Sequence, residues 1–189
     1  MASVLVCYGT IEGQTGTVAD RIATALEAGG HEPTVVDLGG ADADPADFDA
    51  VLVGSSIHVG SHQSAVTGFA EANRDALAGR PTGFFQVSLS SAVDDEKRRA
   101  DAAGYANDFV EATGWEPDRV GLFGGALRYS EYGFLKRWMM KRIAKGATGD
   151  TDTSRDYEYT DWEEVEAFAN DFAAFVEGRL GVAPPDTKT

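Results

Sequence analysis

The sequence has little cysteine, few basic residues and no long apolar run. Among its 189 residues Cys7 is the one cysteine, so a disulfide within the chain is impossible and a reducing cytoplasm is the expected setting. The start shows no charged segment followed by an apolar one, so a secretory signal is not expected. No run of roughly 18 apolar residues occurs, which argues against a membrane-spanning helix. Cys7 lies in the apolar run 4–8 and is expected to be a buried small hydrophobe.

The charge balance is strongly acidic, with 16 Lys and Arg against 31 Asp and Glu and a net charge of -15. A nucleic-acid-binding surface is therefore not expected, because phosphate contacts need cations. An acidic surface can dock on basic protein partners. It also suits a host with high internal salt, because salt screens the self-repulsion. We favour the second interpretation, since the acidic residues are spread along the whole chain.

Apolar runs alternate with segments of helical spacing along most of the chain. Five runs predict strands, at residues 4–8, 34–38, 50–54, 83–89 and 119–123. Because strands that alternate with helices form parallel sheets covered on both faces, an α/β fold is predicted. Five strands suit a three-layer α/β/α arrangement with strand order 2-1-3-4-5, the flavodoxin-like order. In such sheets the ligand crevice lies beyond the carboxyl ends of the strands, where loops 10–15, 55–62 and 88–94 would meet.

One domain is expected over residues 1–178, because a chain of this length fits a single domain. A last helix is predicted near Asp161, an N-cap residue followed by acidic residues. The Pro- and Thr-rich residues 179–189 are expected to form a flexible tail. The alternation breaks between the fifth strand and the last helix. An insert that follows the start of the fifth strand is therefore expected, at about 127–153.

The segment between the first strand and the first helix is the clearest candidate binding site. It reads Thr10-Ile11-Glu12-Gly13-Gln14-Thr15. A helix N-terminus there offers unpaired N–H groups and a positive dipole end, Gly13 permits close approach of a phosphate, and the threonines add hydroxyls. The loop matches neither the Walker nor the dinucleotide pattern. Its spacing resembles the flavodoxin phosphate signature, which points to FMN. Glu12 stands where many flavodoxins have a hydroxyl, so its carboxylate is expected to turn to solvent.

Two further loops are expected at the same sheet edge, after the third and fourth strands. They supply small residues and backbone amides that would reach the rim of a flat ring: Ser55, Ser56, Ile57, His58 and Gly60, then Ser88, Leu89, Ser90 and Ser91. Typical flavodoxins sandwich the ring with an aromatic residue from one of these loops, and neither loop has one here. An open ring face is therefore expected, which favours an enzyme over a pure electron shuttle. His58 would meet the flavin or a substrate, or would be a solvated loop histidine. No metal site is expected, because Gly60 separates His58 from His62 and no carboxylate cluster accompanies them.

Several separate motifs follow one another between about residues 3 and 177. They lie at 12–15, 54–57 with Gly60 and His62, 115–119, 125–129, 149–153 and 159–162. In this order they resemble the menaquinone-dependent protoporphyrinogen IX dehydrogenases, a branch of the flavodoxin-like proteins. The resemblance implies FMN, two-electron oxidation of a porphyrinogen and transfer of the electrons to a quinone. The flavin would carry the chemistry, and no residue is an obvious general base.

The insert, which the resemblance also implies, holds the one basic segment of the acidic chain, at 134–145. At helical spacing its apolar and basic residues fall on largely opposite faces. Such a helix suits a membrane surface, a hydrophobic substrate that bears carboxylates, or packing on its own domain, and these alternatives stay open. The candidate residues are Arg128, Tyr129, Lys136, Arg137, Trp138 and Lys141. Arg128 would pair with a propionate or brace the insert.

The predicted function is an FMN-dependent, quinone-linked dehydrogenase that oxidises protoporphyrinogen IX or a related reduced substrate. The alternatives are a flavodoxin-type electron carrier that serves protein partners, and a flavodoxin-like interaction domain without a cofactor. Fold alone does not decide between them. The expected location is the cytoplasm, or a peripheral position at the inner face of the cell membrane through residues 134–145.

Overall fold

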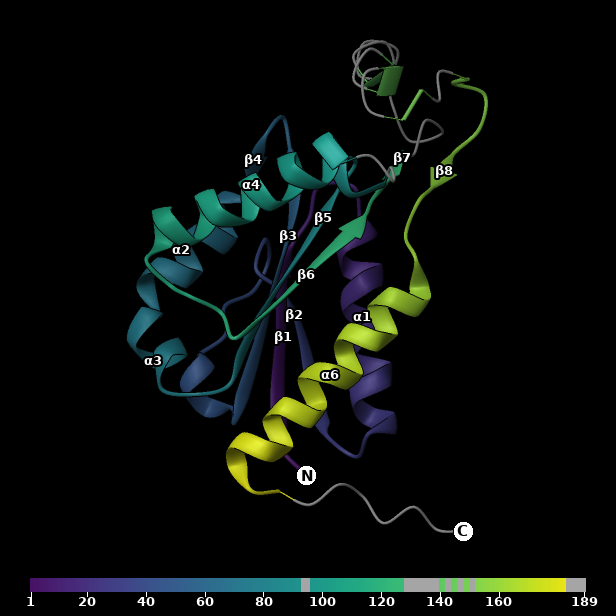
Figure 1. Cartoon of the computed structure of the whole chain (residues 1–189). Helices are drawn as coiled ribbons and strands as arrows, with labels where there is room; N and C mark the ends of the chain where they lie inside the picture. Colours follow the sequence, from purple (N-terminus) through teal and green to yellow (C-terminus); the bar gives the residue numbers. More distant parts are fainter. Residues whose placement is uncertain (93–95, 128–139, 142–143, 146–147, 150–151, 183–189) are drawn as a thin grey trace, which may run out of the picture.

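The computed structural model of the chain describes residues 1–92, 96–127, 140–141, 144–145, 148–149 and 152–182 (Figure 1). The strands are β1 (Ser3–Gly9), β2 (Glu32–Asp37), β3 (Ala50–His58), β4 (Ser61–His62), β5 (Thr82–Ser88), β6 (Arg119–Gly124), β7 (Ala126–Leu127) and β8 (Tyr157–Glu158). The helices are α1 (Gln14–Ala28), α2 (Ser64–Ala72), α3 (Arg74–Ala78), α4 (Glu96–Thr113) and α6 (Trp162–Leu180), with 3-10 turns η1 (Pro45–Asp47) and η2 (Ser90–Ala92).

The main sheet has the order β2-β1-β3-β5-β6, and all of these pairs are parallel. Val6 of β1, for example, lies between Val35 of β2 and Leu52 of β3. The three central strands are almost wholly buried, which agrees with their continuous apolar runs. The α/β class and the predicted order of the five long strands are confirmed. The order reverses direction between β1 and β3, so their carboxyl ends flank the crevice of the sheet.

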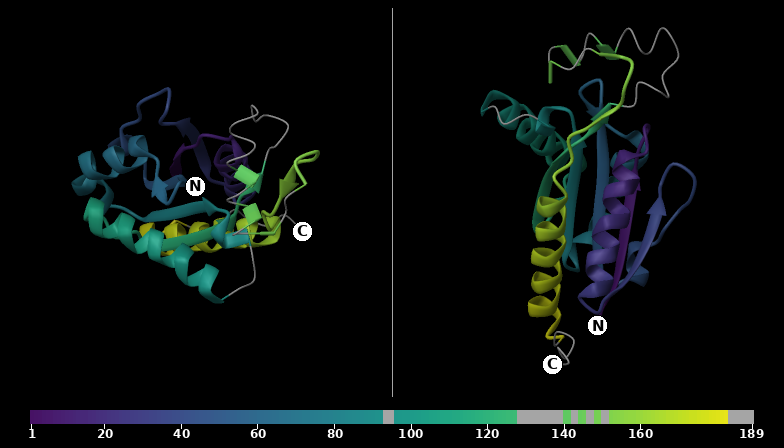
Figure 2. Two further views of the ribbon diagram at one scale, coloured as in Figure 1. Left: turned by 90° about the horizontal axis from the view of Figure 1, so that it is seen from above. Right: turned by 90° about the vertical axis from the view of Figure 1, so that its right-hand side faces the viewer.

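Alternate residues of the central strands face two separate apolar cores. Val4, Val6 and Phe85 face α1 and α6, whereas Leu5 and Cys7 face the layer of α2, α3 and α4. Figure 1 shows these two helical layers on opposite sides of the sheet, and in Figure 2 α1 and α6 run side by side. The three-layer arrangement is confirmed.

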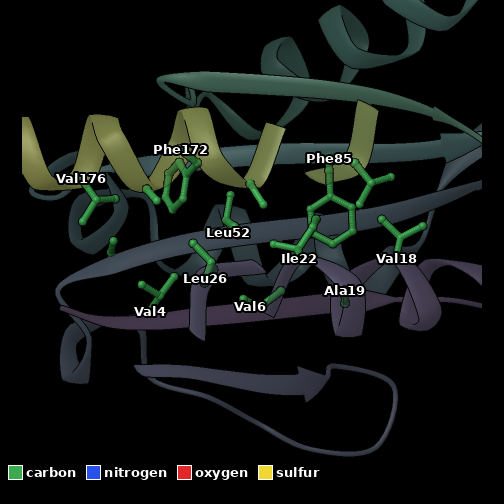
Figure 3. Close-up of a cluster of buried hydrophobic side chains, with 14 of the residues drawn as sticks. Val4, Val6, Val18, Ala19, Ile22, Leu26, Leu52, Phe85, Phe172 and Val176 are labelled. Atoms are coloured by element: carbon green, nitrogen blue, oxygen red, sulfur yellow. The ribbon is translucent and has the colours of Figure 1, made fainter. Parts of the chain in front are cut away.

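The core between the sheet, α1 and α6 explains why the first helix forms where it does. Val18, Ile22 and Leu26 recur every fourth residue and are fully buried on one face of α1. Figure 3 shows them directed toward Phe85 and Phe172. Burial of each such side chain contributes roughly 1.5–3 kcal/mol. This packing fixes the axis of α1, and therefore the direction in which its N-terminus points.

The structure adds local detail that the sequence patterns did not predict. The third strand continues to His58 and turns back as the short strand β4, through a two-residue turn at Val59 and Gly60 with φ of 51° and 79°. Positive φ at both positions is the geometry of a type I′ hairpin. The segment between β4 and β5 forms two helices, α2 and α3, which meet at Asn73 with φ of -110°.

The expected insert lies between two paired short strands, β7 and β8. We call this antiparallel pair the β7–β8 ribbon. The chain leaves the sheet after the end of β6 at Gly124, and Figure 1 shows the ribbon beyond the carboxyl ends of the strands. The last helix begins after Asp161, whose carboxylate accepts N–H bonds from Glu163 and Glu164, and it extends to Leu180. Of the expected tail, residues 183–189 lie outside the described residues. Among the helices of the described part, none is long and apolar enough to span a bilayer.

Candidate functional site at the carboxyl edge of the sheet

A cleft opens beyond the carboxyl ends of β1, β3, β5 and β6. Its walls come from the three predicted loops, from the start of the ribbon and from the insert. They consist of Thr10, Ile11, Glu12, Gln14, Thr15, Ser56, Ile57, His58, Val87, Ser88, Leu89, Gly125, Ala126 and Met140. The three loops predicted to meet at one edge therefore do meet.

The loop before α1 has the features of an anion site. Gly13 takes a left-handed φ of 84°, and its N–H donates to the Thr10 hydroxyl at 3.0 Å. No side chain in the described part of the chain caps the helix, so its first turn presents N–H groups to the cleft. The Thr15 side chain lines the cleft and is fully buried, and its hydroxyl has no hydrogen-bond partner among the described residues. A buried hydroxyl costs free energy unless it is paired, so this one indicates that a ligand completes it.

Glu12 departs from the prediction made for it. The side chain is half-buried and lines the cleft, and one carboxylate oxygen is out of contact with solvent. The prediction that the carboxylate turns to solvent is therefore wrong. A carboxylate therefore stands in the cleft wall beside the loop before α1.

The predicted residues at the carboxyl end of β3 fall into two groups, those that line the cleft and those that hydrogen-bond to the start of α2. Ser56, Ile57 and His58 line the cleft. Ser55 is fully buried, and its hydroxyl accepts the N–H of Gln63 at 3.1 Å. The Gln63 amide in turn donates to the Ser56 hydroxyl at 3.0 Å, so both serines hold the entry of α2. Gly60 lies in the hairpin turn beside Tyr105 and does not line the cleft.

The residues after β5 divide in the same way. Ser88 and Leu89 line the cleft. The Ser88 hydroxyl accepts the N–H of Ser91 at 3.1 Å and lies 2.9 Å from its hydroxyl, which closes the turn η2. Ser90 and Ser91 are part of that turn and do not line the cleft.

Four cleft residues were not among the predicted site residues: Val87, Gly125, Ala126 and Met140. Gly125 and Ala126 follow the fifth long strand, so the edge rule that selected the other loops could have found them. Met140 is buried with Leu127 and Ala144 in a small cluster against Leu89, Tyr157 and Tyr159. Its place depends on long-range packing, which leaves no signal in the local sequence.

The remaining predicted residues belong to the insert. Arg128, Tyr129, Lys136, Arg137 and Trp138 lie outside the described residues. Lys141 is described and exposed. Hydrogen bonds from Ser154 hold the pKa of the exposed Asp152 carboxyl below its usual value. The positive charges of Arg155 and Lys141 add a smaller effect in the same direction. The contact of Lys141 with substrate or membrane stays a prediction.

His62 lies behind the cleft wall rather than in it. It pairs with the cleft residue Ile57 through the β3–β4 hairpin. Its Nε2 lies 3.0 Å from Oε1 of the buried Gln86, whose amide nitrogen donates to Ala102. Because Gln86 therefore offers its oxygen, Nε2 of His62 carries the proton. Burial lowers the pKa of His62, against a smaller opposing effect of the Gln86 hydrogen bond. Among the described residues, no group of three His, Cys, Asp or Glu side chains is placed to hold a metal ion.

Comparison with known proteins first defines the class. The sequence profile of the flavodoxin domain family matches residues 5–154. A solved short-chain flavodoxin, associated with a non-canonical PDU bacterial microcompartment, superposes with a TM-score of 0.59 at 16% identity, over 93% of this chain and 99% of that one. The fold is therefore that of the flavodoxins.

Two curated relatives narrow the family. The chain is 35% identical to protoporphyrinogen IX dehydrogenase (quinone) of Escherichia coli strain K12, over 89% of this chain and 93% of the relative. It is 36% identical to the protein of that name in Leishmania major, over 90% of this chain and 74% of the relative. The chain belongs to the protoporphyrinogen IX dehydrogenase family and is an oxidoreductase of the flavodoxin-like class.

Proposed function

We propose that the chain binds FMN non-covalently in the cleft, oxidises protoporphyrinogen IX or a closely related porphyrinogen, and passes the electrons to a quinone. The observation that most supports FMN as the cofactor is the buried, unpaired hydroxyl of Thr15 at the N-terminus of α1, among the described residues. A phosphate monoester supplies the acceptors that this hydroxyl and the N–H groups of the first helical turn need.

The phosphate group would be held by Thr10, Gln14 and Thr15, with Gly13 permitting its approach. A Cβ on Gly13 would meet nothing within 4 Å, so the left-handed backbone rather than crowding is what requires glycine there. The positive end of the α1 dipole adds an attraction of about 0.3–1 kcal/mol for an anion. These neutral donors work without a lysine or arginine among the described lining residues.

The flavin ring would be held by Ser56, Ile57 and His58 after β3 and by Ser88 and Leu89 after β5. The described lining contains no Phe, Tyr or Trp, so none of these rings from it would cover the flavin. When bound, FMN supplies a two-electron acceptor that a quinone can reoxidise. Ile11, which is 51% exposed, and Met140 give the cleft an apolar margin suited to a hydrophobic substrate.

The relatives named as quinone-dependent protoporphyrinogen IX dehydrogenases support the choice of substrate and acceptor. A porphyrinogen is a largely apolar macrocycle with carboxylates, so an open apolar cleft can admit it. Action in the cytoplasm with a peripheral membrane contact through 134–145 would bring the site to a lipid-borne quinone. That contact stays a prediction, because most of the segment lies outside the described residues.

Two measurements test the proposal in order. The purified protein is first titrated with FMN, and we expect flavin absorption bands that remain with the protein after gel filtration. The loaded protein is then mixed with protoporphyrinogen IX and a menaquinone analogue, and we expect porphyrin fluorescence to develop faster than with the flavin-free protein. Absence of FMN binding would show a cofactor-free domain, and binding without a flavin-dependent rate would refute the dehydrogenase.

The net charge of -15 favours one second candidate, an electron carrier for basic protein partners. Stepwise reduction of the loaded protein distinguishes the two functions. A carrier would take up electrons in two well-separated one-electron steps and would show no turnover with a quinone. The dehydrogenase would be reduced by its porphyrinogen in one two-electron step.

A further inference from the structure

The hydroxyl of Thr160 joins three segments that are far apart in the sequence. Thr160 lies between β8 and α6, where Figure 1 shows the chain returning from the ribbon to the body of the fold. Its Oγ1 donates to the carbonyl oxygen of Gly124, at the end of β6, at 2.8 Å. The same oxygen accepts an N–H from the side-chain amide of Gln14, the first residue of α1, at 2.8 Å.

This position requires a small group that donates and accepts at once. The Gln14 side chain is 4% exposed, so its amide needs an acceptor inside the protein. The backbone around Gly124 is closely packed, since a Cβ on Gly124 would meet the Tyr159 carbonyl oxygen at 2.3 Å. The group that donates to the Gly124 carbonyl must therefore be small. A hydroxyl satisfies both groups, and a methyl group of the same size satisfies neither.

The hydroxyl connects the two sides of the cleft. On one side, Gln14 starts the helix whose first turn includes Thr15. On the other side, the Tyr159 N–H donates to the Gly125 carbonyl at 3.0 Å, and the Gly125 N–H donates to the Ser88 carbonyl at 3.0 Å. Gly125 and Ser88 both line the cleft. A shift of Thr160 would therefore move the phosphate loop and the root of the ribbon together.

We propose that Thr160 is a positioning residue that couples the phosphate loop to the β7–β8 ribbon. Flavin binding at the loop then stabilises the ribbon, and the ribbon in turn strengthens flavin binding, because such coupling is reciprocal. This inference rests on the proposed binding of FMN. It adds a role for a residue that lies outside the cleft lining.

The first test compares the affinities of Thr160→Val and Thr160→Ser for FMN, measured by quenching of flavin fluorescence. The valine has the same shape and lacks the hydroxyl, and the serine keeps it. We expect Thr160→Val to weaken binding by at least about fivefold, the lower end of typical coupling between sites. We expect Thr160→Ser to bind FMN as tightly as the original protein, because serine keeps the hydroxyl. An unchanged affinity in Thr160→Val overturns the inference while the proposed function stands.

The second test measures hydrogen exchange in the peptide around 157–160, with each protein saturated by FMN so that affinity does not enter. We expect FMN to slow exchange of the Tyr159 amide in the original protein and in Thr160→Ser. In Thr160→Val we expect this added protection to be lost. Equal protection in the three proteins overturns the coupling.

Thr113→Val is the matched control for a purely structural effect. The Thr113 hydroxyl is also buried, donates to the Phe109 carbonyl at 2.8 Å and accepts the Trp115 N–H at 3.3 Å, but it lies at the end of α4 before β6 starts. Its loss should destabilise the fold and leave FMN affinity unchanged. If Thr113→Val weakens FMN binding as much as Thr160→Val does, the effect is one of stability and the inference fails. If the original protein binds no FMN, both the proposed function and the inference fail.

Discussion

The Thr15 hydroxyl destabilises the flavin-free protein and would bind the phosphate of the proposed ligand. It is buried without a partner among the described residues, and such a group costs roughly 1–3 kcal/mol. We expect Thr15→Val to raise the midpoint of unfolding of the flavin-free protein and to weaken FMN binding about tenfold, the worth of one charge-assisted hydrogen bond. Chemical denaturation and fluorescence titration measure the two effects. A loss of stability with unchanged affinity would contradict both the burial argument and the phosphate assignment.

Val59 is a second residue that the local backbone does not favour. It has a φ of 51°, which is rare for a β-branched residue and costs free energy. Val59 is 72% exposed, so burial of its side chain offsets little of this cost. We expect Val59→Asn to stabilise the protein by about 1 kcal/mol, because asparagine tolerates this conformation. Val120→Asn is the matched control. Val120 is also exposed but lies in β6, where we expect the same change to be neutral or unfavourable in urea denaturation.

At the scale of elements, periodicity and edge rules predicted most of the fold. The helical spacing of Val18, Ile22 and Leu26 is the pattern typical of α1, and the continuous apolar strands predicted the parallel sheet. The β3–β4 hairpin was missed because Val59 stands where a type I′ turn usually has asparagine or glycine. The ribbon was missed because two-residue strands have no measurable alternation.

The candidate site was predictable as far as backbone topology determines it. The loops that follow β1, β3 and β5 do converge, and this much follows from strand order alone. The direction of each side chain depended on hydrogen bonds that no local pattern reveals. The Ser55 and Ser88 hydroxyls turn toward the backbone N–H groups of Gln63 and Ser91, whereas Glu12 turns into the cleft.

The β3–β4 hairpin should make stability depend on pH through His62. Its ring is half-buried against Phe84 and Phe109, and burial lowers its pKa below the usual 6.5. In the unfolded chain His62 takes up a proton at a higher pH than in the folded one, so the unfolded state binds more protons in that window. The free energy of unfolding should therefore decrease as pH falls below about 6.5, until the folded pKa is reached.

His62→Gln isolates this contribution. Glutamine does not titrate, and its amide can still donate to Gln86. Urea denaturation at pH 7.5 and pH 5.5 should show a smaller loss of stability in this variant than in the original protein. The same loss in both proteins would assign the pH dependence to other groups.

At the scale of the whole molecule, the parallel sheet brings segments from most of the chain to a single edge. The cleft walls include residues from Thr10 to Met140, and the bonds of Thr160 extend this set to the start of α6. Because a ligand in the cleft contacts both halves of the sheet, its binding should stabilise the fold as a unit. The stabilisation follows RT ln(1 + [FMN]/Kd), so it grows with flavin concentration.

The net charge of -15 is the other property of the whole molecule, and it predicts a dependence of stability on salt. With 16 Lys and Arg against 31 Asp and Glu, ion pairs such as Arg21–Glu166 and Arg119–Asp171 cannot neutralise all the carboxylates, so repulsion opposes the compact state. Between 0.01 M and 1 M salt the screening length falls from about 30 Å to about 3 Å. We expect the midpoint of thermal unfolding to rise with KCl, by roughly 2–4 °C for each kcal/mol gained.

The shape of the salt curve separates the two interpretations of the acidity. Screening of repulsion acts mostly at low concentration, because the screening length changes most there. A protein adapted to high internal salt should go on gaining stability into the molar range, and this is the result we expect. A gain that is complete by about 0.2 M, where the screening length is already under 8 Å, would mean that ordinary screening is sufficient. The acidity would then be better explained by docking on a basic partner, and the same KCl series would weaken that complex.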